Sequence, residues 1–181
     1  MSNKFQQKFG YPVERTKGKV RPSMHPWVQD FIRHSPFCVM ATSNQAGDCD
    51  ASPKGGKPGF VKVINDKQLL VPDVAGNKLF HGYGNLASNA KVGLVFFIPG
   101  HNNTVRINGS VKVIDRHELD NVQLEVNNAD ERAEILQGLL LDVEESYSHC
   151  PRALKFSNLW DVDQIAKNIA APPVGGKEPG I

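Results

Sequence analysis

The sequence contains few cysteines and no long apolar stretch. Its three cysteines, Cys38, Cys49 and Cys150, are odd in number and widely spaced. Such spacing argues against a disulfide framework and is typical of proteins from a reducing compartment. The longest apolar runs, near residues 92–99 and 139–141, are far shorter than the roughly 20 residues that a membrane-spanning helix requires. We therefore expect a cytoplasmic protein that does not cross a membrane.

The sequence also lacks an excess of charge of either sign. Its formal net charge is +2, and its lysines and arginines are scattered rather than gathered in a stripe. A face that binds nucleic acid or an acidic membrane surface would need such a stripe. The first residues are polar and lack the apolar core of a secretory signal. We therefore expect neither nucleic acid nor a membrane as a partner.

Several common catalytic motifs are missing. The chain has no Gly-x-Gly-x-x-Gly after a predicted strand, no phosphate-binding loop ending in Gly-Lys-Ser/Thr and no His-Glu-x-x-His. None of its six histidines pairs with another ligand at metal-binding spacing, and the neighbours His149 and Cys150 diverge on any regular element. We predict no metal site, and no residue stands out as a general acid or base.

The length of 181 residues suits one domain with its own core. Residues 1–22 mix glycine, proline and lysine without periodicity, so we expect an extended N-terminal arm there. Residues 23–165 are predicted to form the domain. Residues 166–181 are predicted to form a C-terminal tail, because proline and glycine dominate them.

Short runs of β-favouring residues dominate the predicted domain. They lie at residues 37–42, 49–52, 60–64, 69–71, 92–98 and 104–114, and Pro53 is expected to end the second of them. Helices are predicted after Ser23 as N-cap, within residues 76–89 and over residues 116–124. Residues 135–143 fit neither the helical nor the strand period. The pattern indicates an antiparallel barrel or sandwich.

Three segments carry residues that could hold an anion. In residues 50–60, Ser52, Lys54 and several glycines could surround one, although a surface turn explains the same composition. Asn77 and Lys78 enter a predicted helix, where free N–H groups bind phosphate, or they are an ordinary helix cap with an incidental lysine. Arg106 lies on the polar face of a predicted strand, where it could serve an anionic ligand or lie in solvent.

Taken in order, these segments resemble the pyridoxamine 5′-phosphate oxidase-like family of FMN-binding split barrels. The resemblance covers roughly residues 23–161. The matching segments are Ala41-Thr42, Asp50-Ala51-Ser52-Pro53-Lys54-Gly55, Pro58-Gly59-Phe60-Val61, Leu70-Val71-Pro72-Asp73, Gly76-Asn77-Lys78, residues 85–96, Arg106-Ile107-Asn108-Gly109, residues 149–154 and Ser157-Asn158-Leu159-Trp160. The resemblance implies a mainly β fold, a six-stranded antiparallel split β-barrel with flanking helices, in which residues 139–143 form a late strand.

The resemblance also implies a homodimer with FMN bound at its interface. By position, the cofactor-binding residues would be Ala51, Ser52, Pro53, Lys54, Val71, Pro72, Asp73, Asn77, Lys78, Arg106 and Trp160. Asn77 and Lys78 would hold the phosphate, and Trp160 would approach the flavin from the partner subunit. Lys54 or Arg106 would face the part of the flavin ring where negative charge grows on reduction.

Two departures from the family pattern bear on the substrate. Pyridoxamine phosphate oxidases proper carry an Arg-x-Val-Leu-Leu-Lys strand where this chain has Ala51-Ser52-Pro53-Lys54, and they end in an Arg-Leu-His-type motif that has no equivalent after Trp160. Vitamin B6 oxidation is therefore disfavoured.

The function implied by the resemblance is an FMN-dependent oxidoreductase acting on an unidentified small organic substrate, with NAD(P)H or oxygen as electron partner. Three alternatives remain open at this stage. The chain could be a non-catalytic flavin-binding or redox-sensing protein, a haem-binding split barrel or a deazaflavin-dependent reductase.

Overall fold

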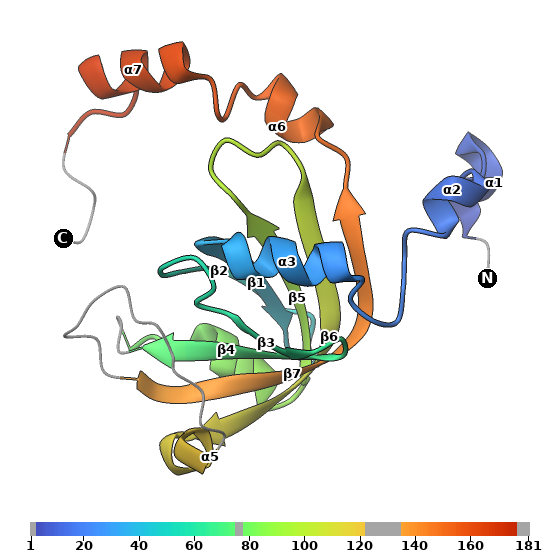
Figure 1. The fold of residues 1–181 in the computed structure, drawn as a ribbon, viewed down its shortest axis with the longest axis vertical. Helices are drawn as coiled ribbons and strands as arrows, with labels where there is room; N and C mark the ends of the chain where they lie inside the picture. Colours follow the sequence, from blue (N-terminus) through green and yellow to red (C-terminus); the bar gives the residue numbers. More distant parts are fainter. Residues whose placement is uncertain (1–2, 75–77, 122–134, 177–181) are drawn as a thin grey trace.

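The computed structural model describes residues 3–74, 78–121 and 135–176, and an antiparallel sheet forms its centre (Figure 1). Within these residues the strands follow the order β2-β1-β5-β6-β7-β4-β3. The strands are β1 (Phe37–Ser43), β2 (Cys49–Gly55), β3 (Lys62–Asn65), β4 (Gln68–Val74), β5 (Lys91–Phe97), β6 (Thr104–Asp115) and β7 (Ile135–His149). The sheet formed by these residues thus has seven strands rather than the expected six, with the β3–β4 hairpin at one edge.

The helices flank this sheet (Figure 1). They are α1 (Lys4–Phe9), α2 (Glu14–Lys17), α3 (Pro26–His34), α4 (His81–Leu86), α5 (Arg116–Asn121), α6 (Arg152–Phe156) and α7 (Val162–Ala170). Among the described residues, none of these helices has both the length and the apolar character needed to cross a bilayer.

The main core lies on the concave face of the curved sheet. Alternate residues of β1 and β5, such as Met40 and Leu94, are fully buried and point to this side. Helix α3 covers them with Val28, Phe31 and Ile32. The predicted mainly β fold with flanking helices is therefore confirmed.

Helix α3 begins later than the predicted Ser23 cap. His25 is its N-cap, and the His25 Nδ1 atom accepts a hydrogen bond from the Trp27 backbone N–H at 3.2 Å. Pro26 explains the shift, because its ring presets the first helical φ angle and keeps the preceding residue extended. The helix ends at His34, and Ser35 is its C-cap.

Strand β2 continues through Pro53 to Gly55, so the prediction that Pro53 ends it is wrong. Among the described strands, β2 lies at the edge of the sheet and pairs with β1 alone. A strand at an edge needs ladder hydrogen bonds on one side only, which is why proline is tolerated there.

Strand β7 contains the segment that fitted neither period, and its assignment as a late strand is confirmed. Leu139 and Leu141 face the main core, whereas Leu140 packs on a second cluster with Leu70 and Leu119 on the other side of the sheet. Both faces are apolar here, so the alternation that identifies a strand disappears.

The second cluster also changes the face of β6 that is buried. Strict alternation along the strand would put Val105 and Val113 on the same face, but Val105 is fully buried and Val113 is 42% exposed. Ile114 is buried instead, because it packs against Leu119 of α5.

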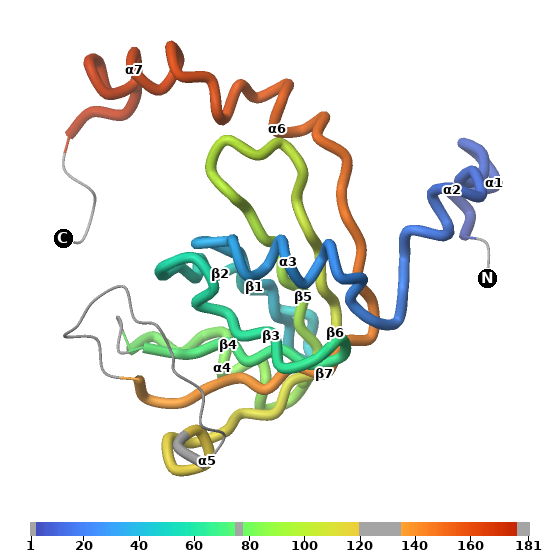
Figure 2. Tube along the Cα trace, in the orientation of Figure 1, coloured from blue at the N-terminus to red at the C-terminus, as the bar shows by residue number. Residues whose placement is uncertain are grey.

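The terminal segments make little contact with the core. The predicted extended arm contains α1 and α2, neither of which buries a residue, and α1 forms locally because Asn3 and Gln6 build a capping box. Helices α6 and α7 also bury no residue, and they lie away from the sheet (Figure 2). The predicted boundary at residue 165 falls inside α7.

Candidate functional site

An ion pair joins two strands that are not neighbours in the sheet. Lys54 of β2 donates from Nζ to Oδ1 of Asp73 in β4 at 3.2 Å, with side chains only 22% and 10% exposed. Both side chains point to the inner face, because Lys54 is paired with buried Cys38 and Asp73 follows buried Val71 by two residues. The pair therefore bridges the opening of the split barrel.

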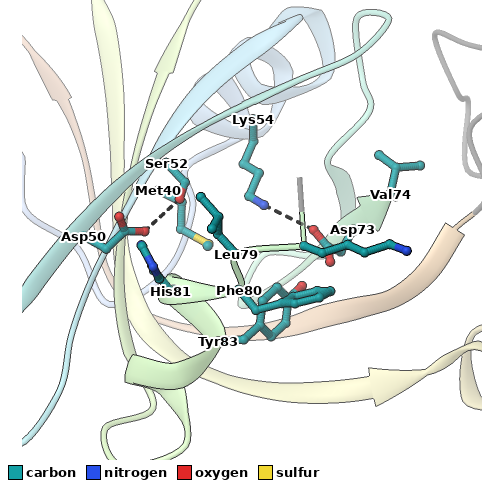
Figure 3. A pocket seen from close by; sticks show the side chains of 12 residues that line it. Met40, Asp50, Ser52, Lys54, Asp73, Val74, Leu79, Phe80, His81 and Tyr83 are labelled. Carbon is teal, nitrogen blue, oxygen red and sulfur yellow. Dashed lines mark hydrogen bonds and ion pairs between the residues drawn. The ribbon is translucent and has the colours of Figure 1, made fainter. Parts of the chain in front are cut away.

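A cavity of about 200 Å³ lies around this ion pair (Figure 3). Strands β1, β2 and β4 form one part of its wall, and the segment leading into α4 forms the other. Its lining residues are Met40, Asp50, Ser52, Lys54, Asp73, Val74, Lys78, Leu79, Phe80, His81, Gly82 and Tyr83. The cavity combines charged groups with apolar walls, as small-molecule sites do.

Helix α4 is anchored to the sheet beside the cavity. The Asn85 side-chain amide donates to the Thr42 hydroxyl at 3.0 Å, and both residues are buried. The chain reaches this helix through Lys78 and Phe80, whose φ angles of 61° and 52° lie in the left-handed region. Non-glycine residues adopt this conformation only where the surrounding structure imposes it, and such residues concentrate at functional sites.

Two carboxylates in the cavity have defined partners. Ser52 Oγ donates to Asp50 Oδ2 at 2.8 Å, and Asp73 accepts from Lys54 through Oδ1. In the described residues no carboxylate forms an ion pair with Lys78. Lys78 is thus the cavity cation best placed to serve an anionic ligand.

Tyr83 contributes a buried hydroxyl to the cavity. This hydroxyl lies against the side chains of Asp73 and Gln137, although it is not within 3.5 Å of a partner among the described residues. Burial, and next the negative charge of Asp73, raise the pKa of the Tyr83 phenol far above its usual range. The phenol therefore stays protonated and keeps a hydrogen to donate.

The structure brings four of the predicted site residues together, namely Ser52, Lys54, Asp73 and Lys78. Ala51 and Pro53 are exposed on the opposite face of β2. Val71 is packed in the main core, and Pro72 is buried with its backbone paired to Gly138 of β7.

The remaining predicted residues lie elsewhere. Arg106 is on the outer face of β6, where its guanidinium donates to the Tyr147 hydroxyl at 2.9 Å and lies over the Tyr147 ring. Trp160 donates from Nε1 to the carbonyl of His101 at 3.2 Å, beside the β5–β6 connection. Asn77 lies outside the described residues.

The predicted set did not include most of the residues leading into α4. Leu79, Phe80 and Tyr83 lie at helical spacing within the predicted helix of residues 76–89, and such spacing indicates burial but not a cavity. The left-handed backbone at Phe80 has no local sequence signal, because phenylalanine rarely adopts it. Asp50 belonged to a matching segment, and its position two residues before Ser52 on a strand was the signal that could have placed it here.

The curled sheet, its flanking helices and the opening between β2 and β4 define a split β-barrel. A sequence profile described as pyridoxamine 5′-phosphate oxidase matches residues 24–150, and the chain belongs to this family. No curated protein sequence matches the chain.

Three solved structures illustrate the shared fold. A histidine-to-alanine variant of HupZ from Group A Streptococcus is 14% identical, with 70% of this chain and 99% of that chain covered and a TM-score of 0.50. A candidate pyridoxamine 5′-phosphate oxidase from Lactobacillus delbrueckii is 20% identical, with 70% and 95% covered and a TM-score of 0.50. A candidate 5-nitroimidazole antibiotic resistance protein from Bacteroides thetaiotaomicron is 12% identical, with 72% and 86% covered and a TM-score of 0.50. At these identities the likeness concerns the fold alone.

Proposed function

We propose that this chain binds FMN in the cavity between β2 and β4 and acts as an oxidoreductase on a small organic molecule. The observation that carries the proposal is the gathering of Ser52, Lys54, Asp73 and Lys78 around one cavity. These residues come from three of the segments through which the sequence resembles the flavin-binding members of its family.

The charges in the cavity fit a phosphorylated ligand with an uncharged ring. Asp73 already forms an ion pair with Lys54, so Lys78 is the group that would hold the FMN phosphate. The walls near Phe80 and Met40 are apolar and suit the ring system. FMN would supply the hydride or electron transfer chemistry.

The protein's own groups would control that chemistry. The backbone N–H groups around Ser52 and Lys54 would position the ring, and the Lys54 ammonium would favour negative charge developing beside it. The buried position of the Lys54–Asp73 pair excludes much of the water, which strengthens this interaction.

The cavity also supports a homodimer. Its volume of about 200 Å³ is below the roughly 300–1,000 Å³ of typical small-molecule sites. One chain would therefore enclose only part of FMN, and a partner subunit would cover the rest. We propose that Trp160 and Arg106 belong to the surfaces that complete the site across the interface.

The visible absorption spectrum of the purified protein tests the cofactor, together with the mass of any released chromophore. We expect a flavin spectrum and the mass of FMN. A colourless protein that also fails to bind added FMN would overturn the proposed function.

Lys78→Ala tests the phosphate assignment in the same assay. We expect FMN affinity to fall about tenfold or more, because a charge-assisted contact contributes about 1.5–3 kcal/mol. Lys57→Ala is the matched control, because Lys57 is exposed and does not line the cavity. Equal FMN affinities in the wild type and Lys78→Ala would contradict the assignment.

A further inference from the structure

The N-terminal arm is attached to the sheet where it passes β7. Arg21 forms an isolated β-bridge with Ser146 through backbone hydrogen bonds of 3.0 and 2.8 Å in the two directions. The Ser146 hydroxyl donates to the Ser23 carbonyl at 2.7 Å, and Met24 is buried in the main core. The chain just before α3 therefore has a defined position beside β7 (Figure 1).

A groove of about 300 Å³ lies between this part of the arm, the start of α3 and the end of β7. Its lining residues are Gly18, Lys19, Arg21, His25, Trp27, Val28, Ser146, Tyr147 and Ser148. The volume is at the lower end of the range of small-molecule sites. The groove shares no lining residue with the cavity between β2 and β4, so it is a separate place of ligand size.

The groove carries an excess of positive charge. Lys19 and Arg21 line it, whereas none of its described lining residues is an aspartate or glutamate. Neither of these two cations forms an ion pair within the described part of the chain. Glu145, which lies two residues before Tyr147 on β7, is engaged with the Asn108 amide at 2.6 Å. Uncompensated positive charge in a groove attracts an anion.

The neighbouring histidine responds to the same charges. The His149 ring packs beside the Tyr147 ring with centroids 5.3 Å apart. Burial, and next the positive charges of Arg106 and Lys19, lower the pKa of the His149 imidazole. The end of β7 therefore disfavours a further cation, which agrees with the composition of the groove.

Aromatic side chains form two walls of the groove. Trp27 of α3 is 42% exposed, and Tyr147 of β7 is held by the Arg106 guanidinium, which donates to its hydroxyl at 2.9 Å. His25 Nδ1 accepts from the Trp27 backbone N–H. The neutral His25 imidazole therefore carries its proton on Nε2 and can donate it. A flat apolar wall beside cations suits a planar ring that carries phosphate.

We propose that this groove binds a nucleotide, with Lys19 and Arg21 contacting the phosphate groups and Trp27 stacking on the base. Lysine and arginine hold phosphate through charge-assisted hydrogen bonds. The indole ring offers a heterocycle a flat face of large area. The inference goes beyond the proposed function, because the groove contains none of the residues assigned to the FMN cavity.

Calorimetric titration of the full chain with ADP, without FMN and with saturating FMN, tests the proposal. We expect ADP to bind in both cases. Lys19→Ala and Arg21→Ala should each weaken ADP binding about threefold to tenfold, because each removes one charge-assisted contact at a solvent-exposed position. Lys17→Ala is the matched control, because Lys17 is exposed, is paired with Glu14 and does not line the groove.

Two fragments of ADP separate the ring from the phosphate. Adenosine and pyrophosphate should each bind at least about tenfold more weakly than ADP. Trp27→Leu should weaken ADP and adenosine binding about fivefold or more, since stacking on an aromatic side chain is lost. The same variant should leave pyrophosphate binding unchanged. Thermal unfolding of Trp27→Leu confirms that the variant is folded.

FMN also carries a phosphate and a planar ring, so the variants must separate the two sites. Lys78→Ala should weaken FMN binding and leave ADP binding unchanged, whereas Lys19→Ala should do the reverse. Competition between FMN and ADP, with Lys78→Ala weakening both, would place ADP in the FMN cavity and overturn the inference.

Three further results would overturn the inference and leave the proposed function intact. They are the absence of ADP binding, equal ADP affinity in the wild type and the Lys19→Ala and Arg21→Ala variants, and equal affinity for pyrophosphate and ADP. The last result would mean that exposed cations attract any anion. A wild-type protein that binds ADP in the groove but not FMN would contradict the proposed function alone.

Discussion

At the scale of single residues, the Lys54–Asp73 pair explains how a split barrel keeps a defined opening. Strands β2 and β4 share no backbone ladder, so side chains must set their separation. Both members are largely buried, and removing either one would leave an uncompensated charge inside the barrel. The pair thus fixes the width of the cavity and the position of the Lys54 ammonium in it.

Cys38 gives a prediction about thiol reactivity. Burial raises the pKa of the Cys38 thiol to about 12, although the nearby Lys54 charge lowers it somewhat. Cys49 and Cys150 are exposed. A thiol reagent such as dithiobis(nitrobenzoate) should therefore modify two cysteines in the folded protein at about pH 8 and the third only after unfolding, because the thiolate is the reactive form. Rapid modification of all three in the folded protein would contradict this.

The raised pKa of the Cys38 thiol also predicts that the stability of the protein depends on pH. Above pH 9.0, the usual thiol value, the unfolded chain loses the Cys38 proton while the folded chain keeps it up to about pH 12. The contribution of Cys38 to the free energy of unfolding is therefore complete below pH 9.0. Above that pH it decreases by at most about 1.4 kcal/mol per pH unit. Cys38→Ala should unfold with a shallower loss of stability over this range, as measured by denaturant titration.

The residues of the site show how far position in the sequence predicts function. The structure brings Lys54 and Asp73, from two of the matching segments, to neighbouring walls of one cavity. The matching segments grouped Ala51 and Pro53 with Lys54, but successive residues of a strand point to opposite faces. Resemblance to a family identifies the strand as a whole. The alternation of side chains along the strand decides which of them face the cavity.

At the scale of elements, β6 and β7 hold the sheet together through an irregular register. Asn108 pairs with Glu145 and Gly109 with Val143, so Glu144 is an extra residue in β7. Gly109 has no side chain at the point where the two backbones approach. A Cβ atom there would overlap the backbone carbonyl oxygen of Asp142. The bulge therefore requires glycine for space.

Gly109→Ala should consequently destabilise the protein by about 2 kcal/mol or more, because the overlap is with backbone that cannot rotate away. Gly84→Ala is the matched control. Gly84 is an exposed residue of α4 with open space around it, and alanine should stabilise the helix by up to about 1 kcal/mol. Denaturant unfolding of both variants measures the difference. Equal stability for Gly109→Ala and the wild type would contradict the assigned bulge.

The elements themselves were largely predictable because most strands bury only one face. β1 and β5 alternate cleanly and were assigned from the sequence. β7 was not, since Leu139 is buried on one side of the sheet and Leu140 is partly buried on the other. The outer side of β4 and β7 packs against α5, and α5 is remote in sequence from β4. Such packing is a tertiary effect, so a local hydrophobic pattern cannot predict it.

At the scale of the whole molecule, the terminal segments lie outside the part that matches the family. The profile ends at residue 150, and α6 and α7 follow it with exposed apolar side chains, including Phe156, Val162 and Ile169. Residues 23–165 remain our proposed domain. In the part of the chain that the structure describes, α7 buries none of its nine residues, and isolated helices of this length are marginal.

The proposed homodimer predicts a linkage between assembly and cofactor. The chain has a mass of 19.9 kDa, and light scattering after size exclusion should give twice this value. FMN should tighten the dimer, because a ligand completed by two subunits binds the assembled form preferentially. Measurement at decreasing protein concentration, with and without FMN, tests this. A monomer that still binds FMN at full affinity would contradict the interface site.

Pro53 has a consequence for how copies of this chain can meet. An unpaired border of a sheet is a template on which further strands can add, and natural proteins interrupt such borders with proline and charged side chains. β2 carries Pro53 between the charged residues Asp50 and Lys54. Association through this border would stop at residue 53, so crowding of the folded protein should yield discrete, face-to-face assemblies rather than cross-β fibrils.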